Sequence, residues 1–393
     1  MQYDSIQTTE LINLMFRLFF FLCVITSALY AAKISPPVDV QGRQFFIVDS
    51  DTDTILFEHD ANMRMFPSSM TKILTAYLLF EAIQSGKITL ESLFTISRKA
   101  SKTQGTKMYL PQGKTVRVDD LIQGMFVASG NDACVCVAEN LDGSEEAFVK
   151  RMNQKLVELG CKQSHFMNAS GLPDQNHYST CHDLYIIAKR LYADFPQFQH
   201  YFAQQTFTFG KGTHKNLNSA LKTFKGADGL KTGHTKIGGY GVVMSAIVNN
   251  QRIFVVMNGC KTMVERNRVS DAILHWAYRT FQQSRLFEKG QVIAHLDTWM
   301  SDYPHVPVVL NTDVLVTLPR VDQSPVSAEL MVAAPLEPPL KAGDKVGELV
   351  VTLSDQKTQV IYPVYSQVTL QKAGYLQRLP MILYYLLFGK NPQ

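Results

Sequence analysis

The chain has 393 residues, of which 46% are hydrophobic and 18% are charged, and its formal net charge is +4. A chain of this length and apolar content can bury a large core and is expected to form about two domains. The mild positive charge occurs without a dense run of lysine or arginine, so no nucleic-acid partner is expected.

The N-terminal segment, residues 1–32, has an apolar core at 18–25 that follows Arg17 and precedes several small residues. This order is typical of a secretory signal peptide. Asp4 and Glu10 in the leading region are less typical of one, and no clean Ala-x-Ala cleavage site follows the core. An uncleaved N-terminal anchor therefore stays open as the alternative.

A buried helix is predicted from Met70 to Ile83, because this stretch lacks Gly and Pro and its apolar residues lie nearly all round the helix. The helix begins near Ser69, and Lys72, three residues later, lies on the same face. Burial can shift a lysine towards its neutral form, in which it can take the proton of a serine hydroxyl. Ser69 and Lys72 are therefore candidates for a nucleophile and its base. Taken alone, this string also fits an N-cap serine followed by a surface lysine.

A second string, Ser129-Gly130-Asn131, interrupts two apolar helical runs with small residues and is expected to form a turn that faces a cleft. There the Ser129 hydroxyl could pass a proton between Lys72 and a leaving group. The Asn131 amide could hold Lys72 or a substrate amide by hydrogen bonds. An ordinary turn with a helix cap at Asp132 is the alternative for this string alone.

The third string, Lys231-Thr232-Gly233, lies in a predicted strand. Gly233 has no side chain, so a substrate backbone can lie against the strand edge. Lys231, together with Thr232 or Thr235, can hold a carboxylate. A turn without function is the alternative for this string alone. Three such strings in this order are much more specific than any one of them.

Apolar runs around the three strings predict the framework of the fold. Runs at 45–48 and 55–57 flank a turn rich in Asp and Thr, and runs at 240–248 and 253–257 flank a pair of asparagines, so two hairpins are expected. A helix over 266–287 should cover the sheet that the hairpins form. The residues between the first and third strings are mostly helical in pattern. The predicted fold class is therefore α/β, a sandwich with a helical insertion.

The composition shifts towards Val, Thr and Pro in the last quarter of the chain. Short alternating runs, separated by Pro and Gly, predict a small β-rich domain over 288–370. The terminal segment 371–393 contains a very apolar stretch at 375–388 with cations near its edges. This stretch is too short to cross a bilayer as a helix, so we expect it to lie in the membrane interface. A terminal helix packed on the protein is the alternative.

The chain has six cysteines, and five remain when Cys23 of the N-terminal segment is left out. An odd number without regular spacing does not describe a disulfide framework, so free buried thiols are expected. Cys134 and Cys136 point in different directions on a helix and cannot bridge readily. A disulfide between Cys161 and Cys181 stays open.

The three strings and their surroundings resemble the D-alanyl-D-alanine carboxypeptidases, the low-molecular-mass penicillin-binding proteins among the penicillin-recognising serine acyl-transferases. The resemblance covers about residues 36–370. Further matching strings are Ser-Gly-Asn-Asp-Ala-Cys at 129–134, Gly-Ser-Glu-Glu-Ala-Phe at 143–148, Asn-Ala-Ser-Gly-Leu-Pro at 168–173 and Asp-Gly-Leu-Lys-Thr-Gly-His-Thr at 228–235. The resemblance implies a β-lactamase/transpeptidase-like catalytic domain at 33–287, an antiparallel sheet with a helical insertion, followed by the small β-domain.

The resemblance also implies a role for each residue of the strings. Ser69 would be the acyl-forming nucleophile and Lys72 its general base. Ser129 and Asn131 would complete the proton-handling network. The backbone N–H groups of Ser69 and His234 would form an oxyanion hole. The implied substrate-binding residues are Lys231, Thr232, Gly233, His234, Thr235 and Arg252.

Two arginine positions bear on how the substrate carboxylate is recognised. Arg252 could equally be an exposed arginine of the second hairpin. A further arginine that some relatives carry shortly before the third string is not evident at 215–219, so recognition of the carboxylate is expected to differ in detail.

The implied reaction begins when Ser69 attacks the carbonyl of the penultimate D-alanine in a peptidoglycan stem pentapeptide. The terminal D-alanine leaves, and water then hydrolyses the ester. A β-lactam antibiotic would acylate the same serine. No metal or other cofactor is expected, because the sequence has no His-Glu-x-x-His and the pair His177 and His182 lacks a ligand set. The enzyme would act at the periplasmic face of the bacterial inner membrane, with its C-terminal segment on the membrane surface.

Three other functions are weighed against this one. A D,D-endopeptidase acting on cross-linked peptidoglycan would use the same machinery. A non-catalytic cell-wall scaffold could keep the fold, although the three intact strings argue against it. A serine β-lactamase would need a base for rapid deacylation, and the Glu-x-x-Leu-Asn string that supplies it in one large class is absent from the sequence.

Overall fold

The computed structural model describes most of the chain, namely residues 34–41, 43–321, 326–333, 335–353 and 359–388. The predicted signal peptide or anchor at 1–32 lies outside the described residues. From Val38 onward the chain forms one compact unit. This unit contains a mixed α/β domain followed by a domain of β-strands, as the sequence predicts.

The α/β domain is built on a five-stranded antiparallel sheet in the order β2-β1-β9-β8-β7. Its strands are β1 (Gln44–Asp49), β2 (Thr54–His59), β7 (Ala227–Thr235), β8 (Gly239–Val248) and β9 (Gln251–Cys260). Both predicted hairpins are present. Asn249 and Asn250 join β8 to β9, and both have a positive φ, as a tight two-residue hairpin turn requires. The third string lies on β7, at the edge of the sheet.

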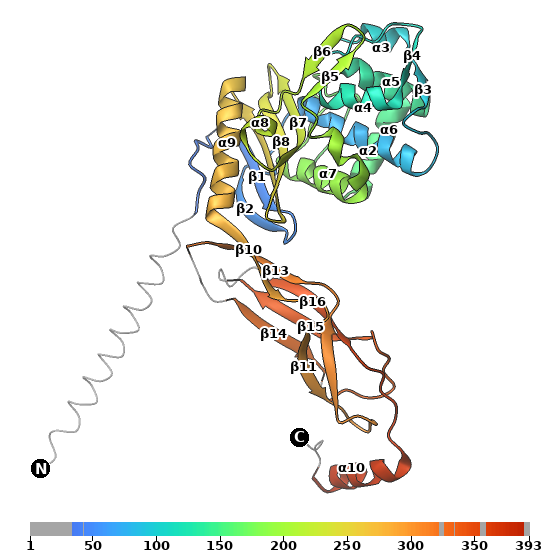
Figure 1. Cartoon of the computed structure of the whole chain (residues 1–393), viewed down its shortest axis with the longest axis vertical. Coiled ribbons are helices and arrows are strands. Elements are labelled where there is room, and N and C mark those ends of the chain that lie inside the picture. Colours follow the sequence, from blue (N-terminus) through green and yellow to red (C-terminus); the bar gives the residue numbers. More distant parts are fainter. Residues whose placement is uncertain (1–33, 42, 322–325, 334, 354–358, 389–393) are drawn as a thin grey trace, which may run out of the picture. The chain divides into compact units, whose positions relative to one another are not determined.

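Both faces of this sheet are buried. Phe45 and Ile47 of β1 pack in an apolar cluster with α9 (Met263–Thr280), whereas Phe46 and Val48 pack in the cluster formed by the helical insertion. Because successive residues of a strand point to opposite faces, a continuous apolar run is what a strand covered on both sides needs. Figure 1 shows α9 on one side of the sheet and the helical insertion on the other.

The helical insertion lies between β2 and β7 in the chain. Its helices are α2 (Lys72–Gln84), α3 (Arg98–Lys102), α4 (Val118–Phe126), α5 (Asn131–Asp142), α6 (Glu145–Glu158), α7 (Cys181–Asp194), η2 (Pro196–Tyr201) and α8 (Ala220–Thr223). Two short ribbons, β3 (Leu93–Thr95) with β4 (Thr115–Arg117) and β5 (Thr206–Phe209) with β6 (Gly212–Lys215), were not predicted. The Thr180 hydroxyl caps α7 by accepting a hydrogen bond from the Asp183 N–H.

The helix predicted over 266–287 is wrong at its C-terminal end. α9 ends at Thr280, and β10 (Phe281–Phe287) pairs with β13 (Val314–Pro319). The residues of β10 include no Gly or Pro that would stop a helix. Their partner strand lies far along the chain, and this non-local pairing overrides the local preference.

The C-terminal domain contains a five-stranded sheet in the order β11-β12-β16-β15-β14. Its strands are β11 (Val292–Asp297), β12 (His305–Leu310), β14 (Ser327–Val332), β15 (Lys345–Thr352) and β16 (Gln359–Ser366). Alternate apolar residues, among them Val306, Val308, Val351 and Val364, form its core. The small β-rich domain predicted from the composition is therefore present.

The last described element is helix α10 (Tyr375–Phe388). Several of its apolar side chains are exposed, and Leu376, Leu386 and Leu387 each keep 66% or more of their surface accessible. No helix within the described part of the chain has both the length and the apolar character needed to cross a membrane.

The cysteines of the described residues are all buried, and all carry free thiols. Cys161 and Cys181, for which a disulfide was left open, are therefore unbridged here. Burial raises the pKa of the Cys134 and Cys136 thiols to about 12, so these groups stay protonated and behave as small apolar side chains.

Candidate active site

Ser69 lies where a short 3-10 helix, η1 (Ser68–Thr71), runs directly into α2. The backbone of Ser68 has a φ of 51°, a left-handed conformation that is unfavourable for residues other than glycine and occurs mainly at constrained sites. Gly171 supports this turn from the opposite side, because a Cβ built on it would lie 1.8 Å from the carbonyl oxygen of Ser68. A side chain at Gly171 would therefore displace the turn that carries Ser69.

The amine of Lys72 has three oxygen neighbours, namely Ser69 Oγ at 2.8 Å, Asn131 Oδ1 at 2.7 Å and the Ser170 carbonyl oxygen at 2.7 Å. The amide and carbonyl oxygens can only accept hydrogen bonds. A neutral amine donates two hydrogen bonds and keeps one lone pair, which then faces the remaining oxygen. The arrangement therefore directs the lone pair of neutral Lys72 at the hydroxyl of Ser69.

Burial also shifts Lys72 towards its neutral form. The side chain is fully buried, and desolvation lowers its pKa from 10.5 to about 8, with the negative charge of Asp132 offsetting part of the shift. At pH 7 a lysine with this pKa is neutral in about one molecule in ten. This fraction is far larger than for an exposed lysine.

A second buried lysine, Lys231, is hydrogen-bonded to a second serine, Ser129. Lys231 Nζ donates hydrogen bonds to Ser129 Oγ and to the carbonyl oxygen of Thr232, both at 3.0 Å. Burial, followed by the positive charge of Lys72, lowers the pKa of Lys231 well below its usual range. Ser129, like Ser68, has a positive φ. The backbone is therefore constrained at both serine-bearing turns.

The turn at Ser129-Gly130-Asn131 is held by hydrogen bonds to the loop that precedes it in the chain. Asn131 Nδ2 donates to the carbonyl oxygen of Gln104 at 2.8 Å, which leaves its Oδ1 for the lysine. The buried carboxylate of Asp132 accepts from the N–H groups of Met108 and Leu110, both at 3.0 Å. Asp132 therefore orders the loop rather than acting as a simple helix cap.

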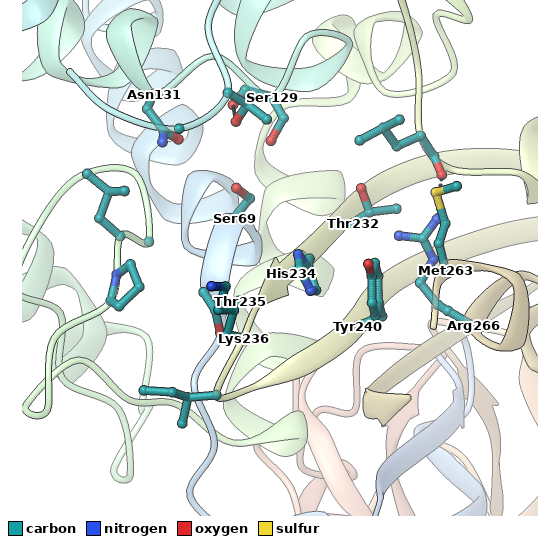
Figure 2. A pocket seen from close by; sticks show the side chains of 18 residues that line it. Ser69, Ser129, Asn131, Thr232, His234, Thr235, Lys236, Tyr240, Met263 and Arg266 are labelled. Atoms are coloured by element: carbon teal, nitrogen blue, oxygen red, sulfur yellow. Dashed lines mark hydrogen bonds between the residues drawn. The ribbon is translucent and has the colours of Figure 1, made fainter. Parts of the chain in front are cut away.

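A cavity of about 670 Å³ opens above these groups (Figure 2). Its lining includes Ser69, Ser129 and Asn131 on one side and Thr232, His234 and Thr235 of β7 on the other. Because β7 is an edge strand, alternate N–H and C=O groups along it are left unpaired and face outward. The cavity thus offers a serine hydroxyl, hydrogen-bonded to a buried lysine, beside a strand edge that can pair with an extended peptide.

Comparison with known proteins shows which protein family this chain matches. Residues 31–261 match the family described as D-alanyl-D-alanine carboxypeptidase. The chain belongs to this family. Residues 281–372 match the C-terminal domain of penicillin-binding protein 5. The chain is a serine-type D-alanyl-D-alanine carboxypeptidase of the low-molecular-mass penicillin-binding proteins, so the predicted family, fold class and enzyme class are confirmed.

Characterised carboxypeptidases resemble the chain over most of its length. D-alanyl-D-alanine carboxypeptidase DacF of Bacillus subtilis is 31% identical over 86% of this chain and 87% of its own length. DacA of Haemophilus influenzae is 33% identical over 81% of this chain and 83% of its own length.

Solved structures agree with this relationship. Penicillin-binding protein 5 from Haemophilus influenzae superposes with a TM-score of 0.78 at 30% identity and covers 86% of this chain and 100% of its own. Penicillin-binding protein D2 from Listeria monocytogenes, solved in its ampicillin-bound form, has a TM-score of 0.57 at 26% identity and covers 62% of this chain and 100% of its own.

The structure of this carboxypeptidase brings together all the predicted site residues except one. Those that line the cavity are Ser69, Ser129, Asn131, Thr232, Gly233, His234 and Thr235. Lys72 and Lys231 lie beneath it and are hydrogen-bonded to the two serines. The ring of His234 stacks on that of Tyr240, with the ring centroids 3.8 Å apart.

Arg252 is the exception, and the substrate-binding role predicted for it is corrected. Its Nη1 donates to Asp228 Oδ2 at 2.7 Å, and its guanidinium lies 4.6 Å above the ring of Tyr192. The ion pair and the aromatic face satisfy the charge of Arg252 inside the fold. It does not line the cavity.

Arg266 is a cavity residue that the sequence did not reveal. It lies near the start of α9, is 3% exposed, and donates from Nη2 to the carbonyl oxygen of Leu217 at 2.8 Å. It shares the buried face of α9 with Val269 and Ile273, three and seven residues later. An arginine within an otherwise apolar helical stripe is the signal that could have identified it.

His177 is a second unpredicted residue beside the site. Its Nδ1 accepts from the N–H of Met167 at 3.1 Å, so Nε2 carries the proton and donates to Thr71 Oγ1 at 2.8 Å. This buried ring links the nucleophile turn to the loop that supplies the Ser170 carbonyl. Burial lowers the pKa of His177 to about 4, so the ring is neutral at neutral pH.

Proposed function

We propose that this carboxypeptidase uses Ser69 as its nucleophile and Lys72 as the general base, and that it acts on the D-alanyl-D-alanine end of peptidoglycan stem peptides. The observation that carries the proposal is the set of acceptors around Lys72 Nζ. They occupy both N–H groups of a neutral amine and leave its lone pair facing Ser69.

In the first step, Ser69 Oγ attacks the carbonyl carbon of the penultimate D-alanine while its proton moves to Lys72 Nζ. The carbonyl oxygen becomes an oxyanion. The proposed donors to it are the N–H group of Ser69, at the positive end of η1 and α2, and the N–H group of His234 on the edge strand.

In the second step, the tetrahedral intermediate collapses and the peptide C–N bond breaks. The leaving nitrogen of D-alanine must take up a proton. Ser129 Oγ is the proposed donor. It takes up in turn the proton that Lys72 received from Ser69, which returns Lys72 to its neutral form, while Lys231 Nζ, 3.0 Å away, stabilises the serine oxygen. Water then attacks the acyl ester and gives up a proton to neutral Lys72, which passes it to Ser69 Oγ as this oxygen leaves as a hydroxyl.

The terminal carboxylate of the substrate needs donors at the end of the cavity where Lys231 lies. Thr232 presents a hydroxyl group there, and Arg266 supplies a fixed positive charge. The hydroxyl of Thr235 instead accepts hydrogen bonds from Ser68 Oγ and from the N–H of Gly238. We assign Arg266 the role that the sequence suggested for Arg252. A β-lactam carries a carboxylate beside a reactive carbonyl, so it should occupy the same groups and acylate Ser69.

Product analysis distinguishes this activity from that of an endopeptidase. The protein is incubated with a stem pentapeptide and, separately, with a cross-linked muropeptide dimer. We expect release of free D-alanine from the pentapeptide, no release by the Ser69→Ala variant, and slow or no cleavage of the dimer. Faster cleavage of the dimer than of the pentapeptide would assign the endopeptidase activity instead.

We further propose that the catalytic domain acts outside the cytoplasm, where peptidoglycan lies, and that α10 lies in the membrane interface. The exposed leucines of α10 support this, because an apolar helix surface of this kind is stabilised by lipid. Lys372 and Arg378 lie where cations can meet anionic headgroups.

A further inference from the structure

A second cavity, of about 490 Å³, adjoins the catalytic cavity at the end of β7. The two cavities share five lining residues, namely His234, Thr235, Lys236, Ile237 and Tyr240. Of the residues assigned to the site, only His234 and Thr235 reach the second cavity. Arg64, Asn258 and Lys261 line the second cavity and do not line the catalytic one.

Three cations line the second cavity, namely Arg64, Lys236 and Lys261, and no acidic residue does. Within the described part of the chain, none of the three forms an ion pair. The guanidinium of Arg64 lies 4.2 Å above the ring of Tyr178, which fixes its position without neutralising its charge. A concave surface with unneutralised positive charge attracts an anion.

A buried amide in the same cavity lacks a partner. Asn258 is 3% exposed and lines the cavity, yet its Oδ1 accepts no hydrogen bond from the described residues. A Cβ on Gly241 would lie 2.5 Å from this oxygen, so glycine is needed there to leave room for the amide. An unpartnered buried amide oxygen is unfavourable. This oxygen is itself inaccessible and packs against Gly241, so the amide forms part of the cavity wall and does not bind a ligand.

The position of the cavity indicates which part of the substrate reaches it. In Figure 2, Thr232 and Arg266 lie to the right of Ser69, whereas Thr235 and Lys236 lie below it. A peptide whose terminal carboxylate is bound near Thr232 and whose reacting carbonyl is at Ser69 must continue past Thr235. Extended chain advances about 3.3 Å per residue, so one or two residues upstream reach the end of β7.

We propose that Arg64, Lys236 and Lys261 form an anion subsite that binds a carboxylate-bearing residue of the peptide upstream of its D-alanyl-D-alanine end. The three cations bind the carboxylate. This inference rests on the proposed function, because it gives the substrate the direction that the Ser69 reaction requires. It defines the preferred substrate as an acidic peptide.

Matched peptide pairs test the subsite. Each pair ends in D-alanyl-D-alanine and carries either glutamate or its neutral isostere glutamine, at the first or the second residue upstream. The measured quantity is kcat/KM for release of D-alanine. We expect the wild type to prefer the glutamate peptide by about fivefold or more at one of these positions, and 0.5 M salt to weaken the preference.

Removing charge from the subsite gives the decisive comparison. The double variant Arg64→Gln/Lys261→Gln should reduce the preference to about twofold or less, with the loss confined to the glutamate peptide. Lys150→Gln, an exposed lysine on α6, is the matched control and should keep the preference. Acylation by a penicillin, which has no upstream residue, checks that the double variant is folded.

Two results overturn the subsite and leave the proposed function intact. One is equal kcat/KM for glutamate and glutamine at both positions. The other is a glutamate preference that is the same in the double variant as in the wild type. If none of the peptides releases D-alanine while penicillin still acylates the protein, the proposed function fails as well.

Discussion

Lys72 is a fully buried lysine whose amine has no carboxylate as a hydrogen-bond partner. A buried ammonium normally needs such a partner, so burial shifts the equilibrium of Lys72 towards the neutral amine. The Ser69 and Lys72 pair could be predicted from the sequence because both residues lie on one helical turn. His177 could not, because it reaches the site from a loop that only tertiary structure brings there. Arg266 could be suspected as a buried arginine from the apolar stripe of α9, but its place at the site depends on tertiary structure.

The first prediction concerns the pH dependence of acylation. Lys72 must be neutral to take the proton of Ser69, and the neutral fraction grows as the pH rises through its pKa of about 8. The rate constant for acylation by a penicillin should therefore rise from pH 6 and reach a plateau above pH 9. Stopped-flow measurement of the acylation rate tests this. A rate that is flat or falls over this range would contradict the role of Lys72.

Substitution of the base provides the second prediction. Lys72→Arg keeps the positive charge but cannot become neutral in this pH range, so acylation should slow by roughly 100- to 10,000-fold. The matched control is Lys189→Arg, a surface position on α7. If Lys72→Arg kept more than half of the wild-type acylation rate, another residue would have to be the base.

The third prediction concerns His177 and stability. Its pKa of about 4 in the folded state lies below the ordinary value of 6.5, so the unfolded chain binds more protons between these two values. The free energy of unfolding should therefore fall as the pH drops from about 6.5 to about 4, by up to about 1.4 kcal/mol per pH unit. Over the same pH range, the free energy of unfolding of the His177→Gln variant should fall less.

Urea titrations at pH 6.5, 5.5 and 4.5 measure this difference. The exposed His200 provides a matched control, and His200→Gln should retain the wild-type pH dependence. A His177→Gln variant that loses as much free energy of unfolding as the wild type would show that other groups cause the acid sensitivity.

At the scale of elements, α2 is the helix around which the catalytic domain packs. Nearly all of its residues are buried, from Lys72 to Ala82. The sequence predicted this because apolar residues lie nearly all round the helix. Such a helix must be covered on all sides, so it positions Ser69 and Lys72 rigidly between the sheet and the other helices.

The fourth prediction tests the packing of α2. Phe80 is fully buried and stacks on Phe198, with ring centroids 4.4 Å apart. Phe80→Ala should lower the free energy of unfolding by about 3–5 kcal/mol, because the surroundings cannot fill the space. Val157→Ala, at an exposed position on α6, should change it by about 0.5 kcal/mol or less. Similar values for the two variants would contradict the packing described for α2.

The elements that could be predicted are those whose signals are local. The hairpin of β8 and β9 has two continuous apolar runs and a pair of asparagines at its turn, and α7 has a capping threonine. β10 and the ribbon of β5 and β6 could not be predicted, because each is defined by a strand partner. The sequence from Phe281 to Phe287 alone is equally compatible with the end of α9.

At the scale of the whole molecule, the catalytic domain is followed by the β-domain and α10. The fifth prediction is that α10 provides the membrane affinity. Chains made without residues 1–32, with and without residues 375–393, are mixed with vesicles that contain anionic phospholipid. The chain that keeps α10 should co-sediment at least about tenfold better, because its exposed leucines enter the interface.

Penicillin acylation at the same rate in both chains would show that the truncated chain is folded. Equal binding of the two chains to vesicles would contradict the interfacial role of α10. It would then favour the alternative of a terminal helix that packs on protein.

The central claim is that Ser69 is the acylated nucleophile. Intact-protein and peptide mass spectrometry after brief treatment with penicillin tests it most directly, with the wild type and the Ser69→Ala variant compared side by side. We predict one covalent penicillin adduct, located on the peptide that contains Ser69, and no adduct in Ser69→Ala. An unmodified wild-type protein, or an adduct on another residue, would contradict the account.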